Sequence, residues 1–203
     1  MTPDAAVSAG LQHSVLPELR AATRRHHDRI EQLLALDAPM RLPRYALVLV
    51  GFERFLAAWD AELREAVPAR LQAWWSARGR LGFVADDLAF TGRPVDLPAV
   101  GPVPRSLPEC SVPAVFGSMY VIEGSALGGQ VITPRLQRDL GLAPGRGASY
   151  FHGHGERTGG MWREFRQRAE AEIGDDPVRR RVACRAAVQT FDALIATFEP
   201  LLR

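Results

Sequence analysis

The sequence predicts an all-α fold in a single domain. Apolar residues recur at steps of three and four along most of the chain, which is the spacing of amphipathic helices. We find no convincing run of alternating apolar and polar residues, so strands are expected to be minor or absent. The chain has 203 residues, 47% of them hydrophobic, which is enough for one core and does not require a second domain. We expect about seven or eight helices over residues 15–203, after a disordered N-terminus at residues 1–14.

The first half of the chain divides into helices at its prolines. One apolar stripe begins at Leu16 and ends before Pro39, and the next begins near Pro43 and stops before Pro68. Two shorter stripes follow before a segment rich in proline and glycine. The expected helices therefore cover residues 16–38, 43–67, 71–75 and 81–90, and a loop is expected at residues 91–108.

One strongly apolar run in the second half is unusually rich in glycine. Start signals at Ser111 and Pro113 and a stop signal at Gly141 predict a helix between them. Each glycine in a helix interior costs ~1 kcal/mol relative to alanine. The glycines at 117, 124 and 128 share one face, where they leave a strip of bare backbone. Either a second helix packs closely on this strip, or a flat ligand lies against it. A loop is expected at residues 143–160, with helices at 161–173 and 177–202.

The composition excludes several classes of function. All 25 basic residues are arginine, which excludes Schiff-base and pyridoxal-phosphate chemistry through a lysine. The net charge of +2 gives no reason to expect a nucleic acid partner. No signal peptide or uninterrupted apolar stretch of about 18 residues is found, so we expect neither export nor a membrane span. Cys110 and Cys184 lack the spacing of a metal or redox motif, which favours a reduced cytoplasmic location.

The few histidines limit the possible metal chemistry. None of the five follows the Glu-x-x-His pattern of di-iron bundles or the H-E-x-x-H pattern of zinc enzymes. Haem fits this limit, because the porphyrin supplies four ligands and the protein needs to supply only one. His27 is our candidate for that ligand, since it lies on the apolar stripe and Glu31 follows one turn later. His26 could equally point inward, and only the Glu31 spacing favours His27. Arg20 and Arg24 lie on the same side, within reach of haem propionates.

Two segments together resemble a known family. Leu19–Glu31 resembles the proximal helix of the haem oxygenases, and Tyr120–Ile132 resembles their glycine-rich distal helix. Ser149–Trp162 is similar to the loop that precedes the next helix in the bacterial subgroup. The resemblance extends over almost the whole chain. The Gly-Ser-Ala-Leu-Gly-Gly form of the distal motif is most like the enzymes that supply biliverdin to bacterial phytochromes.

The resemblance implies an activity and a site. Haem would be both cofactor and substrate, O₂ the co-substrate, and biliverdin, carbon monoxide and ferrous iron the products. An external ferredoxin or reductase would supply electrons, and a phytochrome would be a possible acceptor of the biliverdin. His27 would bind the iron. The implied catalytic residues are Gly124, Ser125, Gly128 and Gly129, and the implied haem-binding residues are Arg20, Arg24, Glu31, Met119, Arg163, Phe191 and Phe198.

Ser125 is where the sequence departs from many members of the family. They carry an aspartate at this position, where it holds a water network beside the bound oxygen. A serine hydroxyl bonds water but carries no charge and is a poor proton relay. A non-catalytic haem-binding or carrier protein on the same scaffold is therefore an alternative. A third hypothesis is a helical bundle without a cofactor, in which the glycines serve only contacts between helices.

Overall fold

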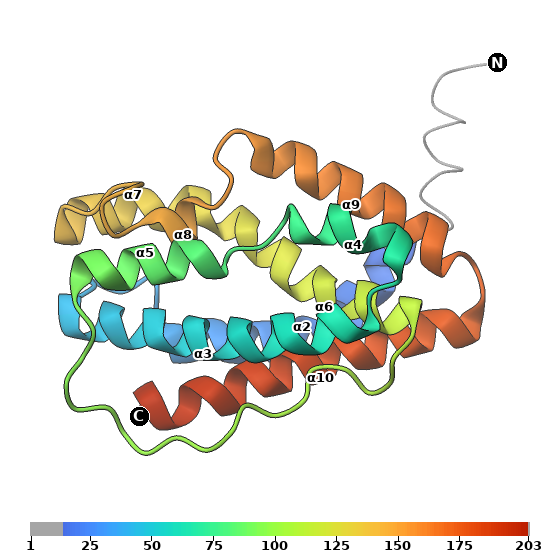
Figure 1. Cartoon of the computed structure of the whole chain (residues 1–203), viewed down its shortest axis with the longest axis horizontal. Coiled ribbons are helices and arrows are strands. Elements are labelled where there is room, and N and C mark those ends of the chain that lie inside the picture. The colour runs from blue at the N-terminus through green and yellow to red at the C-terminus, as the bar shows by residue number, and fades with distance from the viewer. Residues whose placement is uncertain (1–13, 203) are drawn as a thin grey trace.

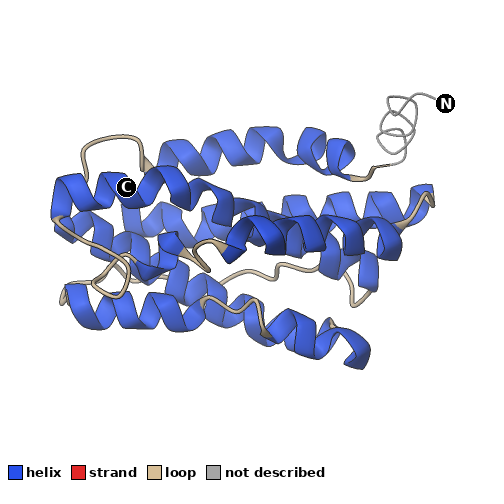
Figure 2. Ribbon diagram, turned by 90° about the horizontal axis from the view of Figure 1, so that it is seen from above, coloured by secondary structure: helices blue, strands red, loops and turns tan. Residues whose placement is uncertain are grey.

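The computed structural model describes residues 14–202, and these residues fold into a helical bundle (Figure 1). Within this range there is no strand, and Figure 2 shows only helices and the loops that join them. The all-α prediction is thus confirmed, whereas most of the predicted disordered N-terminus lies outside the described residues. The helices are α2 (Leu16–Leu34), α3 (Leu42–Ala66), α4 (Ala69–Ser76), α5 (Leu81–Thr91), α6 (Val112–Ser125), the 3₁₀ turn η1 (Ala126–Gly128), α7 (Gly129–Leu140), α8 (Ser149–His152), α9 (Arg157–Ile173) and α10 (Pro177–Leu202).

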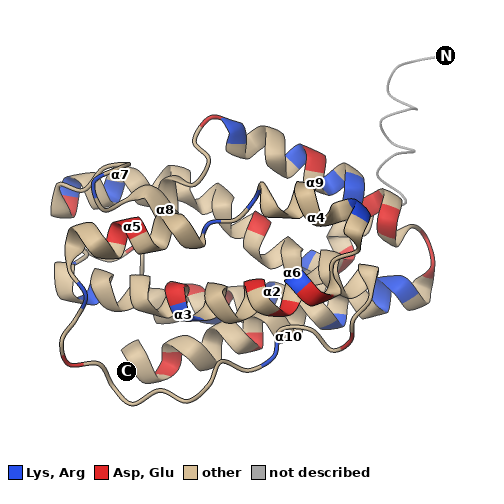
Figure 3. Cartoon of the chain, viewed as in Figure 1, with Lys and Arg blue, Asp and Glu red and all other residues tan. Residues whose placement is uncertain are grey.

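The C-terminal helix α10 packs against several other helices of the bundle. It packs against α2, α3 and α6, while α9 packs on α6 from the other side (Figure 1). Buried apolar residues from all of these helices join in one continuous core. Acidic and basic residues are interspersed along the helices (Figure 3). No helix in the described part of the chain is long and apolar enough to cross a membrane.

The glycine-rich run differs from the single helix expected from its ends. Ser111 caps its start by accepting a hydrogen bond from the backbone N–H of Ala114, and Gly141 ends it with φ of 68°. In the middle the α-helix stops at Ser125, makes the 3₁₀ turn η1, and resumes at Gly129. Because glycine has a poor helix propensity, little free energy is lost when the α-helix is interrupted here.

The loop predicted at residues 143–160 is shorter than expected. It contains the one-turn helix α8, and α9 begins at Arg157 instead of residue 161. The prediction relied on six glycines, but Gly159 and Gly160 lie in the first turn of α9, where the Arg163 side chain lies close to both. Buried Asp87 accepts hydrogen bonds from the backbone N–H groups of Ser149 and Tyr150, both at 2.8 Å, and so starts α8.

Candidate functional site

His27 presents an open imidazole on α2. Its Nδ1 lies 3.4 Å from the Glu31 carboxylate, one turn later, as the spacing predicted. The ring also meets the edge of Phe191 from α10, with the ring centres 6.2 Å apart. The inward orientation predicted for His27 is wrong, because its side chain is 56% exposed at the edge of the α2–α10 contact. With Nδ1 facing Glu31, the nitrogen available to a ligand is Nε2.

The neighbouring His26 turns toward α10. Its Nε2 lies 3.5 Å from Asp192, its side chain is 29% exposed, and its ring stacks on Phe191. Its Nδ1 is buried and has no hydrogen-bond partner among the described residues. His26 therefore packs against α10, and the ring of His27 is the more accessible of the two.

The glycines of the distal segment fall into two groups. A Cβ atom at Gly117 would collide with the backbone of Ala183 on α10, and one at Gly129 would collide with the carbonyl of Phe151. By contrast, a Cβ at Gly124 would meet only the tip of Trp162 at 4.0 Å. At Gly128 it would meet only Cδ1 of Ile132, at 3.6 Å. Helix packing thus explains Gly117 and Gly129, while the backbone of Gly124 and Gly128 remains open.

Two exposed apolar side chains accompany the open glycines. Leu127 is 38% exposed and Val131 is 58% exposed. Val131 lies one turn after Leu127, and Leu127 lies three residues after Gly124, so all three share a helix face. This face is apolar, with bare backbone beside it, which suits a flat apolar ligand.

Tyr120 connects this segment to α2. Its hydroxyl lies close to the side chain of Thr23, whose own hydroxyl donates to the carbonyl of Leu19, and the Arg20 charge lies nearby. Burial raises the Tyr120 pKa, while the nearby Thr23 hydroxyl and the Arg20 charge act against that rise. One turn beyond this contact, α2 carries His27 and α6 carries Gly124. Figure 1 shows that the two helices run in the same direction, so both residues lie on the same side of the contact.

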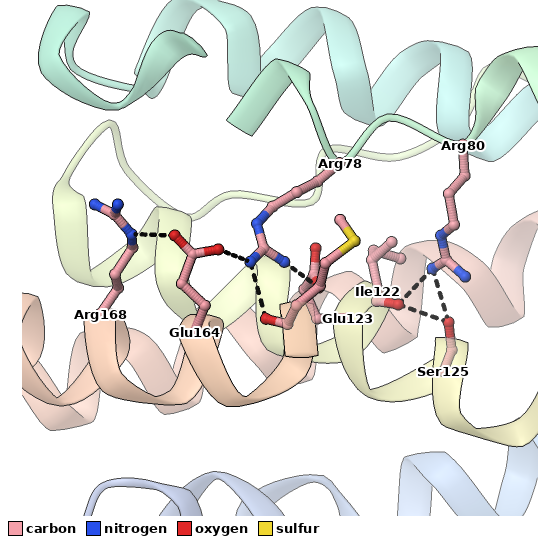
Figure 4. Close-up of polar contacts among 8 residues, drawn as sticks. Arg78, Arg80, Ile122, Glu123, Ser125, Glu164 and Arg168 are labelled. Atoms are coloured by element: carbon pink, nitrogen blue, oxygen red, sulfur yellow. Dashed lines mark hydrogen bonds and ion pairs between the residues drawn. The ribbon is translucent and has the colours of Figure 1, made fainter. Parts of the chain in front are cut away.

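The Ser125 side chain forms two hydrogen bonds at the helix break. Its hydroxyl donates to the carbonyl of Ile122 at 2.8 Å and accepts from the guanidinium of Arg80 at 3.0 Å. Arg80 also donates to the Ile122 carbonyl. In Figure 4 these contacts lie on the side of α6 opposite to α2.

The remaining predicted residues lie in different environments. Arg20 and Arg24 are exposed on α2, and Phe191 is buried beside both histidines. Met119 is 1% exposed and is part of the core. Phe198 packs on Phe52 of α3, with the ring centres 4.8 Å apart. The structure thus brings His27, Glu31 and Phe191 together, while Met119 and Phe198 are core residues.

The sequence interpretation missed Arg78, Arg80 and Glu123. Arg78 and Arg80 are only 6% and 7% exposed, in the loop between α4 and α5. Arg78 donates to the Glu123 carboxylate at 2.7 Å. Burial raises the Glu123 pKa, and the charges of Arg78 and Arg80 oppose that rise. The sequence did contain a feature that points to this ion pair. Glu123 is the one charged residue in the α6 sequence, and a buried carboxylate requires a cationic partner.

Comparisons with known proteins identify one family. The family model described as heme oxygenase matches residues 100–200. A curated relative named heme oxygenase, from Xanthomonas campestris pv. campestris (strain 8004), is 35% identical over 160 residues, which make up 78% of this chain and 88% of the relative. Among solved structures, the NO- and CO-bound heme oxygenase from Neisseria meningitidis matches with a TM-score of 0.67 and 25% identity, over 91% of this chain and 92% of that one.

Proposed function

The chain belongs to the haem oxygenase family, and on that premise we propose that it cleaves haem to biliverdin, carbon monoxide and ferrous iron. O₂ is the co-substrate, and an external donor supplies the electrons. The observation that carries the proposal is the pairing of the open His27 imidazole with the open backbone of Gly124 and Gly128. Both features begin one helical turn beyond the contact of Thr23 with Tyr120.

His27 and Glu31 form the proximal side of the proposed site. Nε2 of His27 would bind the iron, and the Glu31 carboxylate opposite Nδ1 would fix the tautomer and the orientation of the ring. Phe191 supports the imidazole from α10 and limits its rotation. Haem fits this arrangement because it requires only one ligand from the protein.

The glycine segment forms the distal side. At Gly124 and Gly128 the main chain can approach the porphyrin face as closely as backbone atoms allow, because no Cβ intervenes. Leu127 and Val131 supply apolar surface next to these positions. Haem, when bound, supplies the redox-active iron and the meso carbon at which the ring is opened. The close backbone of Gly124 and Gly128 would limit the space on this side of the haem and so favour reaction at one edge of the ring.

Exposed arginines of α2 hold the propionates in this proposal. Arg20 and Arg24 both lie on the exposed side of α2, and Arg20 is also close to Tyr120. Guanidinium groups bind carboxylates through paired hydrogen bonds, which sets the rotation of the porphyrin as well as its depth. Arg163 on α9 is a further candidate, although its side chain lies along the first turn of its own helix.

The partners follow from the same proposal. The sequence has no flavin or nicotinamide fingerprint, so a ferredoxin or a reductase supplies the electrons.

We place the protein in the cytoplasm, where both cysteines remain free thiols as they are in the structure. The form of the distal motif favours a bacterial phytochrome as acceptor of the bilin. Identification of the bilin isomer formed tests this last point together with the orientation of the haem.

One titration tests the proposed function. The protein is titrated with hemin and then exposed to ascorbate and air, while the absorbance spectrum is recorded. We expect a Soret band that appears at equimolar hemin and then decays into a bilin spectrum. A Soret band that persists would indicate a haem carrier, and the absence of a saturable Soret band would indicate a bundle without a cofactor. Either result would overturn the proposal.

A further inference from the structure

Two buried arginines reach the break in the distal helix from the side opposite to the proposed haem site. Arg78 and Arg80 lie in the short loop between α4 and α5, separated by Gly79. Figure 4 shows both side chains extending from that loop toward α6, where they reach it at different points. Arg78 contacts Glu123, and Arg80 contacts Ile122 and Ser125.

Arg80 takes the place of a backbone donor that the helix break removes. In a continuous α-helix the carbonyl of Ile122 would accept from the N–H of Ala126. At the break, the Ala126 N–H is used by the carbonyl of Glu123 instead. The Ile122 carbonyl is then free for the Arg80 guanidinium and the Ser125 hydroxyl, which both donate to it.

The environment of Arg80 is favourable only when the helix ends at this point. A buried cation is costly unless its charge is compensated. Here the compensation comes from the partially negative carbonyl end of α6, from nearby Glu123, and from the face of Tyr150 at 5.4 Å. If α6 continued without a break, the helix would consume the Ile122 carbonyl and leave the guanidinium with fewer acceptors.

Arg78 extends this arrangement to α9. Besides its contact with Glu123, it donates to the carbonyl of Met161 at 2.9 Å and to the Glu164 carboxylate at 3.0 Å. Its guanidinium lies 4.4 Å from the centre of the Trp74 ring. The next residue of α9, Trp162, is the side chain nearest to an added Cβ at Gly124. The loop between α4 and α5 therefore contacts both the helix break and the helix beside it.

We propose that Arg80 is a positioning residue that fixes the break at Ser125, and with it the path of the open backbone from Gly124 to Gly128. Arg78 fixes the same break relative to α9. The inference about the break concerns the protein without ligand, and only its consequence for haem rests on the proposed function. Ser125 is in this view one partner of a guanidinium that ends the helix, which is a role an uncharged hydroxyl can fill.

Amide hydrogen exchange of the protein without haem tests the inference directly. We compare Arg80→Met and Arg80→Lys with the wild type, and use Arg93→Met as the matched control, because Arg93 pairs with Glu53 at the surface. In Arg80→Met we expect the amides of residues 126–130 to exchange roughly 10- to 100-fold faster, the effect of losing a charge-assisted hydrogen bond. The amides of α3 should change at least tenfold less, and Arg80→Lys should restore part of the protection.

A uniform acceleration over α3 and residues 126–130 would show that Arg80 contributes only general stability and would overturn the inference. Unchanged exchange at residues 126–130 would overturn it as well. If Arg80→Met does not fold, Ser125→Ala replaces it, since this variant removes the other partner of Arg80 and should accelerate the same amides selectively.

A second measurement connects the break to the ligand. In hemin titrations, Arg80→Met should bind at least about tenfold more weakly than Arg93→Met and show an altered ferric spin state, because the backbone over the ligand is displaced. Equal affinity and equal spectra would contradict the predicted consequence for haem. If the wild type binds no haem, the proposed function fails, whereas the exchange data still decide whether Arg80 fixes the break.

Discussion

Two adjacent histidines on α2 have different surroundings, and this difference defines their expected roles. His26 stacks on Phe191 and faces Asp192, whereas His27 is 56% exposed and has Glu31 beside Nδ1. Exposure of a ring nitrogen favours ligation, and a carboxylate at the other nitrogen makes the imidazole a better ligand.

Substitution of each histidine distinguishes these roles. His27→Ala should abolish the native axial coordination and weaken haem binding by more than about tenfold, and added imidazole should restore the ferric spectrum. His26→Ala should retain the native coordination, because its ring has a packing role. Ferric absorbance and electron paramagnetic resonance spectra of the two variants check this, and the reverse pattern would exclude His27 as the ligand.

At the level of the element, the glycines of the distal run serve two purposes in one segment. Gly117 and Gly129 allow backbones to approach each other, while Gly124 and Gly128 leave the main chain uncovered. The four glycines look alike in the sequence. Only the atoms that surround each one in the folded structure show which glycines serve packing and which leave the main chain open.

A pair of adjacent substitutions separates packing from ligand binding. Gly129→Ala should lower the free energy of unfolding by roughly 1–3 kcal/mol, because the new methyl group is forced against the Phe151 carbonyl. Gly128→Leu should leave the stability of the ligand-free protein within about 1 kcal/mol and block haem binding. Urea unfolding and hemin titration measure the two effects. Unchanged haem affinity in Gly128→Leu would mean that the open backbone does not face the ligand.

On the scale of the whole molecule, a buried polar chain joins three helices of the core. The indole N–H of Trp59 on α3 donates to the Ser118 hydroxyl on α6 at 2.8 Å. The Ser118 hydroxyl also lies 2.7 Å from that of Thr190 on α10. Ser118 is fully buried, so loss of its hydroxyl leaves polar groups on two other helices without this partner.

Ser118→Ala should therefore destabilise the whole bundle. We expect a loss of about 1–3 kcal/mol in the free energy of unfolding, the usual cost of a buried hydrogen-bonding group left without its partner. Ser76→Ala, at an exposed position of α4, is the control and should stay within about 0.5 kcal/mol of the wild type. Chemical unfolding followed by circular dichroism provides the comparison. Equal losses in both variants would contradict the role of the buried chain.

Much of the architecture was predictable because helix signals are local. Helix starts at Leu16 and near Pro43, the loop after residue 91, and the end at Gly141 all follow from short-range periodicity, prolines and caps. The extra helical turn before residue 161 was missed, because the glycines there suggested a loop. The cause of the break at Ser125 was also missed, because it depends on Arg80, which is 45 residues away in the chain.

The sequence by itself determined the all-α class, the family resemblance, and the spacing of His27 with Glu31, since each of these depends on residues within a few turns of one another. Only the tertiary structure decided which glycines are open, which histidine is exposed, and which buried cations end the distal helix. These features depend on contacts between segments far apart in the chain, and the local pattern of either segment does not contain them.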